Sequence, residues 1–191
     1  MSPSTEPFES ESKEPTTQTV IGRIAHAMEH TLSTGELAQL RRASVESPYS
    51  PALWKLLVAY VPDTWTAGRD RDEKERLWSA VLTGMAITSG LHSPGTPLGQ
   101  ALEQAGWSEL RFVRLLQARG DALVGEVRRV ARFLSSKTQI ADWADMAQLV
   151  LNQREEWAEK HRRRIARSYY SSLHHHERAD SRQSEISKEE P

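Results

Sequence analysis

The apolar residues of this chain recur at helical spacing from about residue 20 to residue 170, and this periodicity limits its fold more than any other feature. Runs in which Val, Ile or Thr alternate with polar residues between turns, as in strands, do not occur. Glycine and proline punctuate the helical stretches, as between Pro62 and Gly68 and between Gly90 and Pro97. We therefore predict an all-α, compact, bundle-like domain of about eight helices, at 20–31, 35–45, 51–60, 70–89, 97–105, 108–118, 121–135 and 142–170, the last of which is open to a break.

The two ends of the chain differ in composition from its middle. Residues 1–18 and 173–191 are rich in Ser, Thr, Glu, Pro and Lys and hold few large apolar side chains, too few to offset the entropy of ordering. We expect an acidic disordered tail at 1–18, one domain at 19–172 and a second disordered tail at 173–191. There is no cysteine, no apolar run near the roughly 18 residues that a membrane span needs, and no secretory pattern at the start. These features predict a soluble, cytoplasmic protein.

The net charge of −1 conceals a basic segment. Residues 107–170 hold thirteen basic and eight acidic side chains, a net charge of +5, while the two ends are acidic. Arginine outnumbers lysine by nineteen to six. A guanidinium matches phosphate oxygens in bidentate fashion, which suits a nucleic-acid surface, but a genome rich in G and C would favour arginine codons equally well.

The expected helices place the basic residues on edges away from the apolar stripes. On 121–135, Leu123, Val127, Val130 and Leu134 are expected to be buried, with arginines opposite them. A basic edge on one helix is usually a solvated face; three in succession favour polyanion binding through phosphates, without sequence readout. The basic positions are Arg41 and Arg42 near the front, Arg111 and Arg114 on 108–118, Arg128, Arg129 and Arg132 on 121–135, and Lys160, Arg163 and Arg167 on the last helix.

The tryptophans are interpreted mostly as core residues. Trp54, Trp78, Trp107, Trp143 and Trp157 lie at apolar-periodic positions, which favours packing over a platform for stacking bases. Trp65 lies in the expected loop from Pro62 to Gly68 and is predicted to be the most exposed of the six.

Signatures of catalysis and of cofactor binding are missing. The chain has no glycine-rich phosphate loop, no G-x-S-x-G, no H-E-x-x-H and no EF-hand loop. The run His174, His175 and His176 with Glu177 could ligate a metal, but it falls in the expected disordered tail. We predict no catalytic residue, no metal and no cofactor.

Five short motifs of the chain are informative in combination: the stretch from Gly35 to Arg42, the stretch from Pro97 to Gly106, Glu109 to Phe112, Val127 to Arg129, and Ile140 to Ala147. Together they resemble the CasB family, the small subunit of the type I-E CRISPR surveillance complex, Cascade. They appear in the family's order and spacing over residues 22–170, and they are fairly specific only in combination.

The resemblance implies an all-helical, non-catalytic protein that binds the other Cascade subunits, large and backbone, and a second copy of itself. It also implies contact with the crRNA, with the target DNA and with the displaced strand, which stabilises the R-loop. Arg42, Arg111 and Arg129 match motif arginines, and Arg41 and Arg128 adjoin them. A further basic position matches Arg71, or Arg69 in a shifted register.

The chain departs from the family where a basic pair is expected after the D-W motif. Glu155 and Glu156 fall there in an ungapped alignment, so Arg154, Lys160 or Arg163 substitutes, or the contact is absent. Two other hypotheses remain open: a helical adaptor whose basic faces meet acidic proteins, and an enzyme that uses the histidine run.

Overall fold

The computed structural model describes residues 14–43, 49–152 and 155–189, and this part of the chain is all-α, as predicted. The expected tail at 1–18 lies outside the described residues except for its last five positions. The helices are α1 (Thr17–His30), α2 (Thr34–Arg42), α3 (Pro51–Tyr60), α4 (Asp63–Thr66), α5 (Arg71–Ile87), α6 (Leu98–Gln104), α7 (Glu109–Gln117), α8 (Gly120–Ser136), α9 (Trp143–Leu151) and α10 (Glu155–Glu189).

The helices differ from the predicted order in two places. The four-residue α4 occupies the expected loop after Pro62, and the predicted helix at 142–170 is two helices, α9 and α10. The side-chain amide of Asn152 donates to the Gln148 carbonyl at 2.8 Å and ends α9. None of the described helices is both long and apolar enough to cross a membrane.

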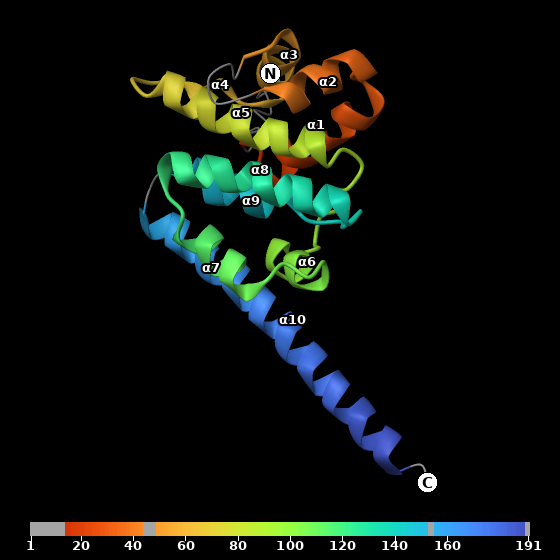
Figure 1. Ribbon diagram of the computed structural model, residues 1–191. Helices are drawn as coiled ribbons and strands as arrows, with labels where there is room; N and C mark the ends of the chain where they lie inside the picture. The colour runs from red at the N-terminus through yellow and green to blue at the C-terminus, as the bar shows by residue number, and fades with distance from the viewer. Residues whose placement is uncertain (1–13, 44–48, 153–154, 190–191) are drawn as a thin grey trace, which may run out of the picture.

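The helices form three tiers in Figure 1, with α8 and α9 in the middle. Helices α1 to α5 lie on one side of this pair, and α6, α7 and α10 lie on the other. Helix α5 packs along α8 and α9, and α10 packs on α6 and α9. The main stripe of α8 is buried as predicted, since Leu123, Val127, Val130 and Leu134 are each less than a tenth exposed.

Two aspartates at the start of α9 tie distant segments together. Asp142 caps α9 by accepting from the Ala144 amide at 2.9 Å, and it also accepts from the Gly95 amide and from Gln18. Asp145 accepts from the Leu98 amide at 2.9 Å. This amide is in the first turn of α6 and has no hydrogen-bond acceptor within its own helix. The D-W motif that carries part of the family resemblance therefore positions α6 and α9.

The tryptophans divide differently from the prediction. Trp78, Trp107 and Trp143 are at most 4% exposed, as expected of core residues. Trp54 and Trp157 are instead 40% and 48% exposed, so the prediction that they are core residues is wrong for these two. Trp65, expected to be exposed, is half-buried and stacks on Trp78 with ring centroids 6.3 Å apart.

Helix α10 continues beyond residue 172, into the segment that its composition predicts to be disordered. The buried carboxylate of Glu103 on α6 accepts from Ser172 at 2.6 Å and lies 2.8 Å from His176. Beyond these contacts α10 projects from the body as a single polar helix to Glu189 (Figure 1). Its Glu, Arg, Ala, Gln and Lys residues are good helix formers, a property that a composition typical of disorder does not exclude.

Candidate nucleic-acid interface

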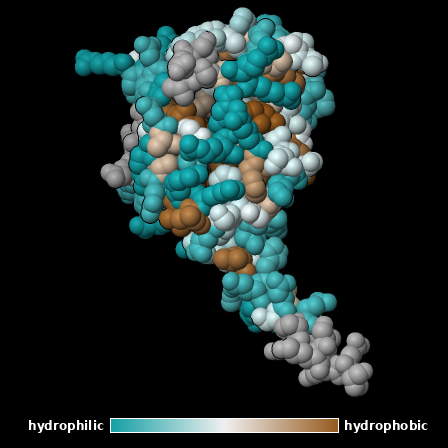
Figure 2. Space-filling view, viewed as in Figure 1, coloured by the Kyte–Doolittle hydropathy of each residue, from teal (hydrophilic) through white to brown (hydrophobic). Residues whose placement is uncertain are grey.

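The candidate arginines on α8 lie on one exposed edge of the helix. Arg129 and Arg132 are exposed and Arg128 is half-buried, on the side opposite the apolar stripe. Helix α8 crosses the middle of the face shown in Figure 1, and Figure 2 shows hydrophilic side chains gathered there. This edge is the centre of the candidate interface.

Arg128 joins this edge to the end of α2. Its guanidinium donates to the carbonyl of Arg41, at 3.1 Å, and to that of Ala43. These carbonyls lie at the C-terminus of α2, where the helix itself supplies no hydrogen-bond donor. Burial, and after it the charge of Arg132, lowers the pKa of Arg128. An arginine nevertheless stays protonated at neutral pH, so it also favours the negative end of the α2 dipole. Arg128 is thus a fold-stabilising residue as well as a surface charge.

The two arginines of α2 follow the same pattern. Arg41 Nε donates to the Ala86 carbonyl at the end of α5, at 2.8 Å, and Arg42 Nε donates to Ala38 at 3.0 Å. Each guanidinium retains further N–H groups, and both side chains are exposed. The end of α2 therefore adds positive charge beside Arg128.

A buried carboxylate links α8 to α7. Glu126 is only 2% exposed, and one of its oxygens forms an ion pair with Arg114 Nε at 2.9 Å and accepts a hydrogen bond from Arg129 at 2.6 Å. The two arginine side chains are more than half exposed above it. One carboxylate thus orients two guanidiniums and leaves a net positive charge at the surface.

Arg111 completes the surface on α7. Its guanidinium carbon lies 5.6 Å from the centroid of the Trp107 ring, a cation–π arrangement that holds an exposed charge in place. We call the arginines of α2, α7 and α8 together the basic α8 surface: Arg41, Arg42, Arg111, Arg114, Arg128, Arg129 and Arg132. Within the described part of the chain, Arg132 makes no hydrogen bond or ion pair.

Four candidate residues lie apart from this surface. Arg71 is at the start of α5, where it pairs with Glu75 at 3.3 Å, about 22 Å of helix from Ala86. The other three, Lys160, Arg163 and Arg167, are on α10 and line a different groove. The structure therefore separates the predicted basic residues into a main surface, one outlying residue and a second cluster.

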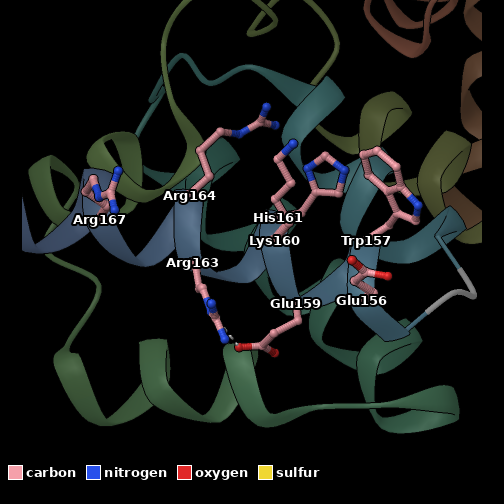
Figure 3. A pocket seen from close by; sticks show the side chains of 8 residues that line it. All are labelled: Glu156, Trp157, Glu159, Lys160, His161, Arg163, Arg164 and Arg167. Atoms are coloured by element: carbon pink, nitrogen blue, oxygen red, sulfur yellow. Dashed lines mark ion pairs between the residues drawn. The ribbon is translucent and has the colours of Figure 1, made fainter.

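The second cluster is a groove of about 630 Å³ along α10, drawn in Figure 3. Lys160 Nζ lies 5.1 Å from the Trp157 ring centroid, and Arg163 pairs with Glu159 at 3.5 Å. Burial, and then the charge of Arg164, lowers the pKa of His161, so the imidazole is neutral at pH 7. We call this site the α10 groove, lined by Glu156, Trp157, Glu159, Lys160, His161, Arg163, Arg164 and Arg167.

Two residues of these sites, Glu126 and Arg164, were not predicted from the sequence. Glu126 lies within an arginine-rich stretch, and its burial follows from the approach of α7, which periodicity does not report. Arg164 follows Lys160 by one helical turn, a signal for a shared edge, but it also bonds Asp145 and Gln148. In the described residues no group of three or more His, Cys, Asp or Glu side chains is arranged to hold a metal.

Comparison with known proteins identifies the family of this fold. The model of the family described as CRISPR-associated protein Cse2 matches residues 36–170. A chain in a crystal structure of E. coli Cascade bound to a PAM-containing dsDNA target superposes with a TM-score of 0.60 at 20% identity, over 79% of this chain and 94% of that one. CasB from Thermobifida fusca superposes with a TM-score of 0.57 at 17% identity, over 80% and 94%. No curated protein matches the sequence.

Proposed function

Because the chain belongs to the Cse2 (CasB) family of CRISPR-associated proteins, we propose that it is the small subunit of a type I-E Cascade complex. In this role it binds nucleic-acid backbone through the basic α8 surface and stabilises the R-loop and the displaced strand. It acts in the cytoplasm by binding rather than by catalysis. R-loop formation is nearly balanced in free energy, so contacts between protein and backbone are sufficient to favour it.

The observation that carries the proposal is the continuity of the basic α8 surface across three helices. Arg128 bridges to the end of α2, and Glu126 bridges Arg114 on α7 to Arg129 on α8. Contacts within the fold hold most of these charges in place, Arg132 excepted, which suits a backbone whose phosphates repeat regularly. None of these contacts requires a particular base, so we expect binding without sequence preference.

The test is fluorescence anisotropy with a labelled single-stranded DNA of mixed sequence at about 50 and 200 mM salt. If five arginines contact phosphates, affinity falls by roughly 100-fold over this range, because each contact contributes about 0.7 to the log–log slope. Arg111→Ala and Arg132→Ala should each weaken binding and reduce the slope by about 0.7. Arg23→Ala, on α1 and outside the surface, removes the same charge and serves as the control.

Two results would contradict this proposal. Binding that does not depend on salt excludes phosphate contacts as its source. An equal loss of affinity in the Arg23 and Arg132 variants shows that net charge, and not the basic α8 surface, governs binding.

Membership of the complex needs its own test. We propose that the chain contacts the large and backbone subunits and a second copy of itself. The full chain, mixed with the other subunits and crRNA, should elute with them on size exclusion at two copies per crRNA. Elution apart from an otherwise complete assembly would contradict the subunit role.

A further inference from the structure

We propose that the α10 groove is a second nucleic-acid site, which takes single-stranded nucleic acid by stacking an unpaired base on Trp157. The inference rests on the proposed nucleic-acid binding and deepens it. The basic α8 surface offers contacts to phosphates, whereas the α10 groove would contact a base and so distinguish single strands from duplexes.

The exposure of Trp157 is the first observation. Its side chain is 48% exposed, whereas the core residues Trp78, Trp107 and Trp143 are at most 4% exposed. An indole ring with half of its surface in water is available to stack on a partner outside the chain. Figure 3 shows the ring standing at the edge of the groove.

The charges around the ring are the second observation. Lys160 Nζ lies over the ring, 5.1 Å from its centroid, and Lys160 and Arg167 make no ion pair with described residues. Arg163 shares Glu159, and Arg164 binds Asp145 and Gln148. The basic side chains recur about once per helical turn, roughly every 5 Å, along the groove that begins at Trp157.

A stacking surface beside free cations matches the chemistry of single-stranded nucleic acid. Aromatic side chains stack on any unpaired base, and neighbouring Lys and Arg side chains bind the phosphates on either side. Inside a duplex each base already stacks on its neighbours, so the ring would gain nothing from it. A groove of about 630 Å³ is large enough for a nucleotide.

The main alternative occupant is an acidic protein segment, which would bind through its charge alone. Single-stranded nucleic acid also has bases that can stack, so a probe without bases distinguishes the two occupants. The probes are a labelled oligothymidine of about 12 nucleotides and an abasic oligomer of the same length and phosphate count. We expect the full chain to bind the oligothymidine about tenfold more tightly at 200 mM salt, because one stacked base contributes on that scale. Trp157→Ala should lose this difference and keep the affinity for the abasic oligomer.

Trp54→Ala is the matched control, since Trp54 is also exposed, at 40%, but lies on α3 beside Tyr49. It should retain the preference for oligothymidine, and Trp157→Phe should retain most of it. Equal binding of the two oligomers by the unaltered chain, or an unchanged preference in Trp157→Ala, overturns the inference. Neither result affects the proposed function, which fails separately if binding is independent of salt and of Arg111 and Arg132.

Discussion

The main chain of Gly99 on α6 lies directly against that of Ile165 on α10. A methyl group at Gly99 would meet the Ile165 carbonyl oxygen and would lie 2.8 Å from the Tyr169 nitrogen. The neighbouring side chains reinforce this crossing: Phe112 stacks on Tyr169 at 3.9 Å, and the Tyr169 hydroxyl donates to the Trp107 carbonyl at 2.7 Å. A glycine is required here because backbone, which cannot move aside, occupies the space that a side chain would take.

Replacing Gly99 by alanine should therefore lower the free energy of unfolding by about 3 kcal/mol, since overpacking against backbone forces α6 and α10 apart. Urea denaturation measures this change. Gly22→Ala is the control, because Gly22 lies in α1 with no atom within 4 Å of the added methyl group. It should be neutral or stabilise the protein by about 0.5–1 kcal/mol. Equal stability of the two variants would contradict the close crossing.

The parts of this fold that could be predicted depend on neighbours in the sequence. The stripe from Leu123 to Leu134 is buried as its spacing of three and four residues requires, because helical periodicity alone places those side chains on one side. The same reasoning located the basic edge of α8. Helical periodicity is sufficient wherever the position of a residue on its own helix decides whether its side chain is buried.

The parts that could not be predicted depend on contacts between distant segments. Arg128 binds carbonyls 85 and 87 residues earlier in the chain, and no local pattern reports such a contact. Likewise, periodicity gave Trp157 and Trp78 the same interpretation, and only the packing of other helices distinguishes an exposed indole from a buried one. The buried Trp78 and the exposed Trp157 therefore cannot be told apart from the sequence pattern.

Arg128 and Arg132 should separate stability from binding, although they lie one turn apart on α8. Arg128→Ala removes the donors to Arg41 and Ala43 and should lower the free energy of unfolding by about 1–2 kcal/mol, a value reduced for its partial exposure. Arg132→Ala removes no hydrogen bond or ion pair with described residues and should leave stability within about 0.5 kcal/mol while weakening DNA binding. Thermal melting and anisotropy measure the two effects. A larger loss of stability in the Arg132 variant would reverse these assignments.

Glu126 offers a test of how the buried carboxylate affects the surface above it. Glu126→Gln keeps the side-chain shape but weakens the contacts to Arg114 and Arg129, so stability should fall by about 1–2 kcal/mol. Loss of the negative charge should tighten single-stranded DNA binding a few-fold at 50 mM salt, because two guanidiniums are no longer partly neutralised. Glu177→Gln, exposed on the projecting part of α10, makes the same charge change and should alter neither quantity. Weaker DNA binding in the Glu126 variant would show that orientation of the arginines outweighs their neutralisation.

The stability of the protein should fall as pH decreases below about 6.5, because His92 is held neutral in the folded state. Burial lowers the pKa of His92, an effect that Asp142 only partly opposes, and Nδ1 of the ring accepts from the Trp143 amide at 3.2 Å. An unfolded histidine binds a proton near pH 6.5, so between that pH and the lowered folded value the unfolded state holds more protons. The stabilisation is therefore full above pH 6.5 and is lost as pH falls through the folded pKa, and His161 acts in the same direction.

Urea denaturation at pH 7.5 and pH 5.5 measures this loss. His92→Asn keeps an acceptor for the Trp143 amide but does not titrate, so the difference in unfolding free energy between the two pH values should become smaller, with the remainder due in part to His161. His30→Asn is the control, because the His30 side chain is 60% exposed and should leave the difference unchanged. If the His92 and His30 variants show the same pH dependence as the unaltered chain, proton uptake by the buried imidazole is not what destabilises the protein in acid.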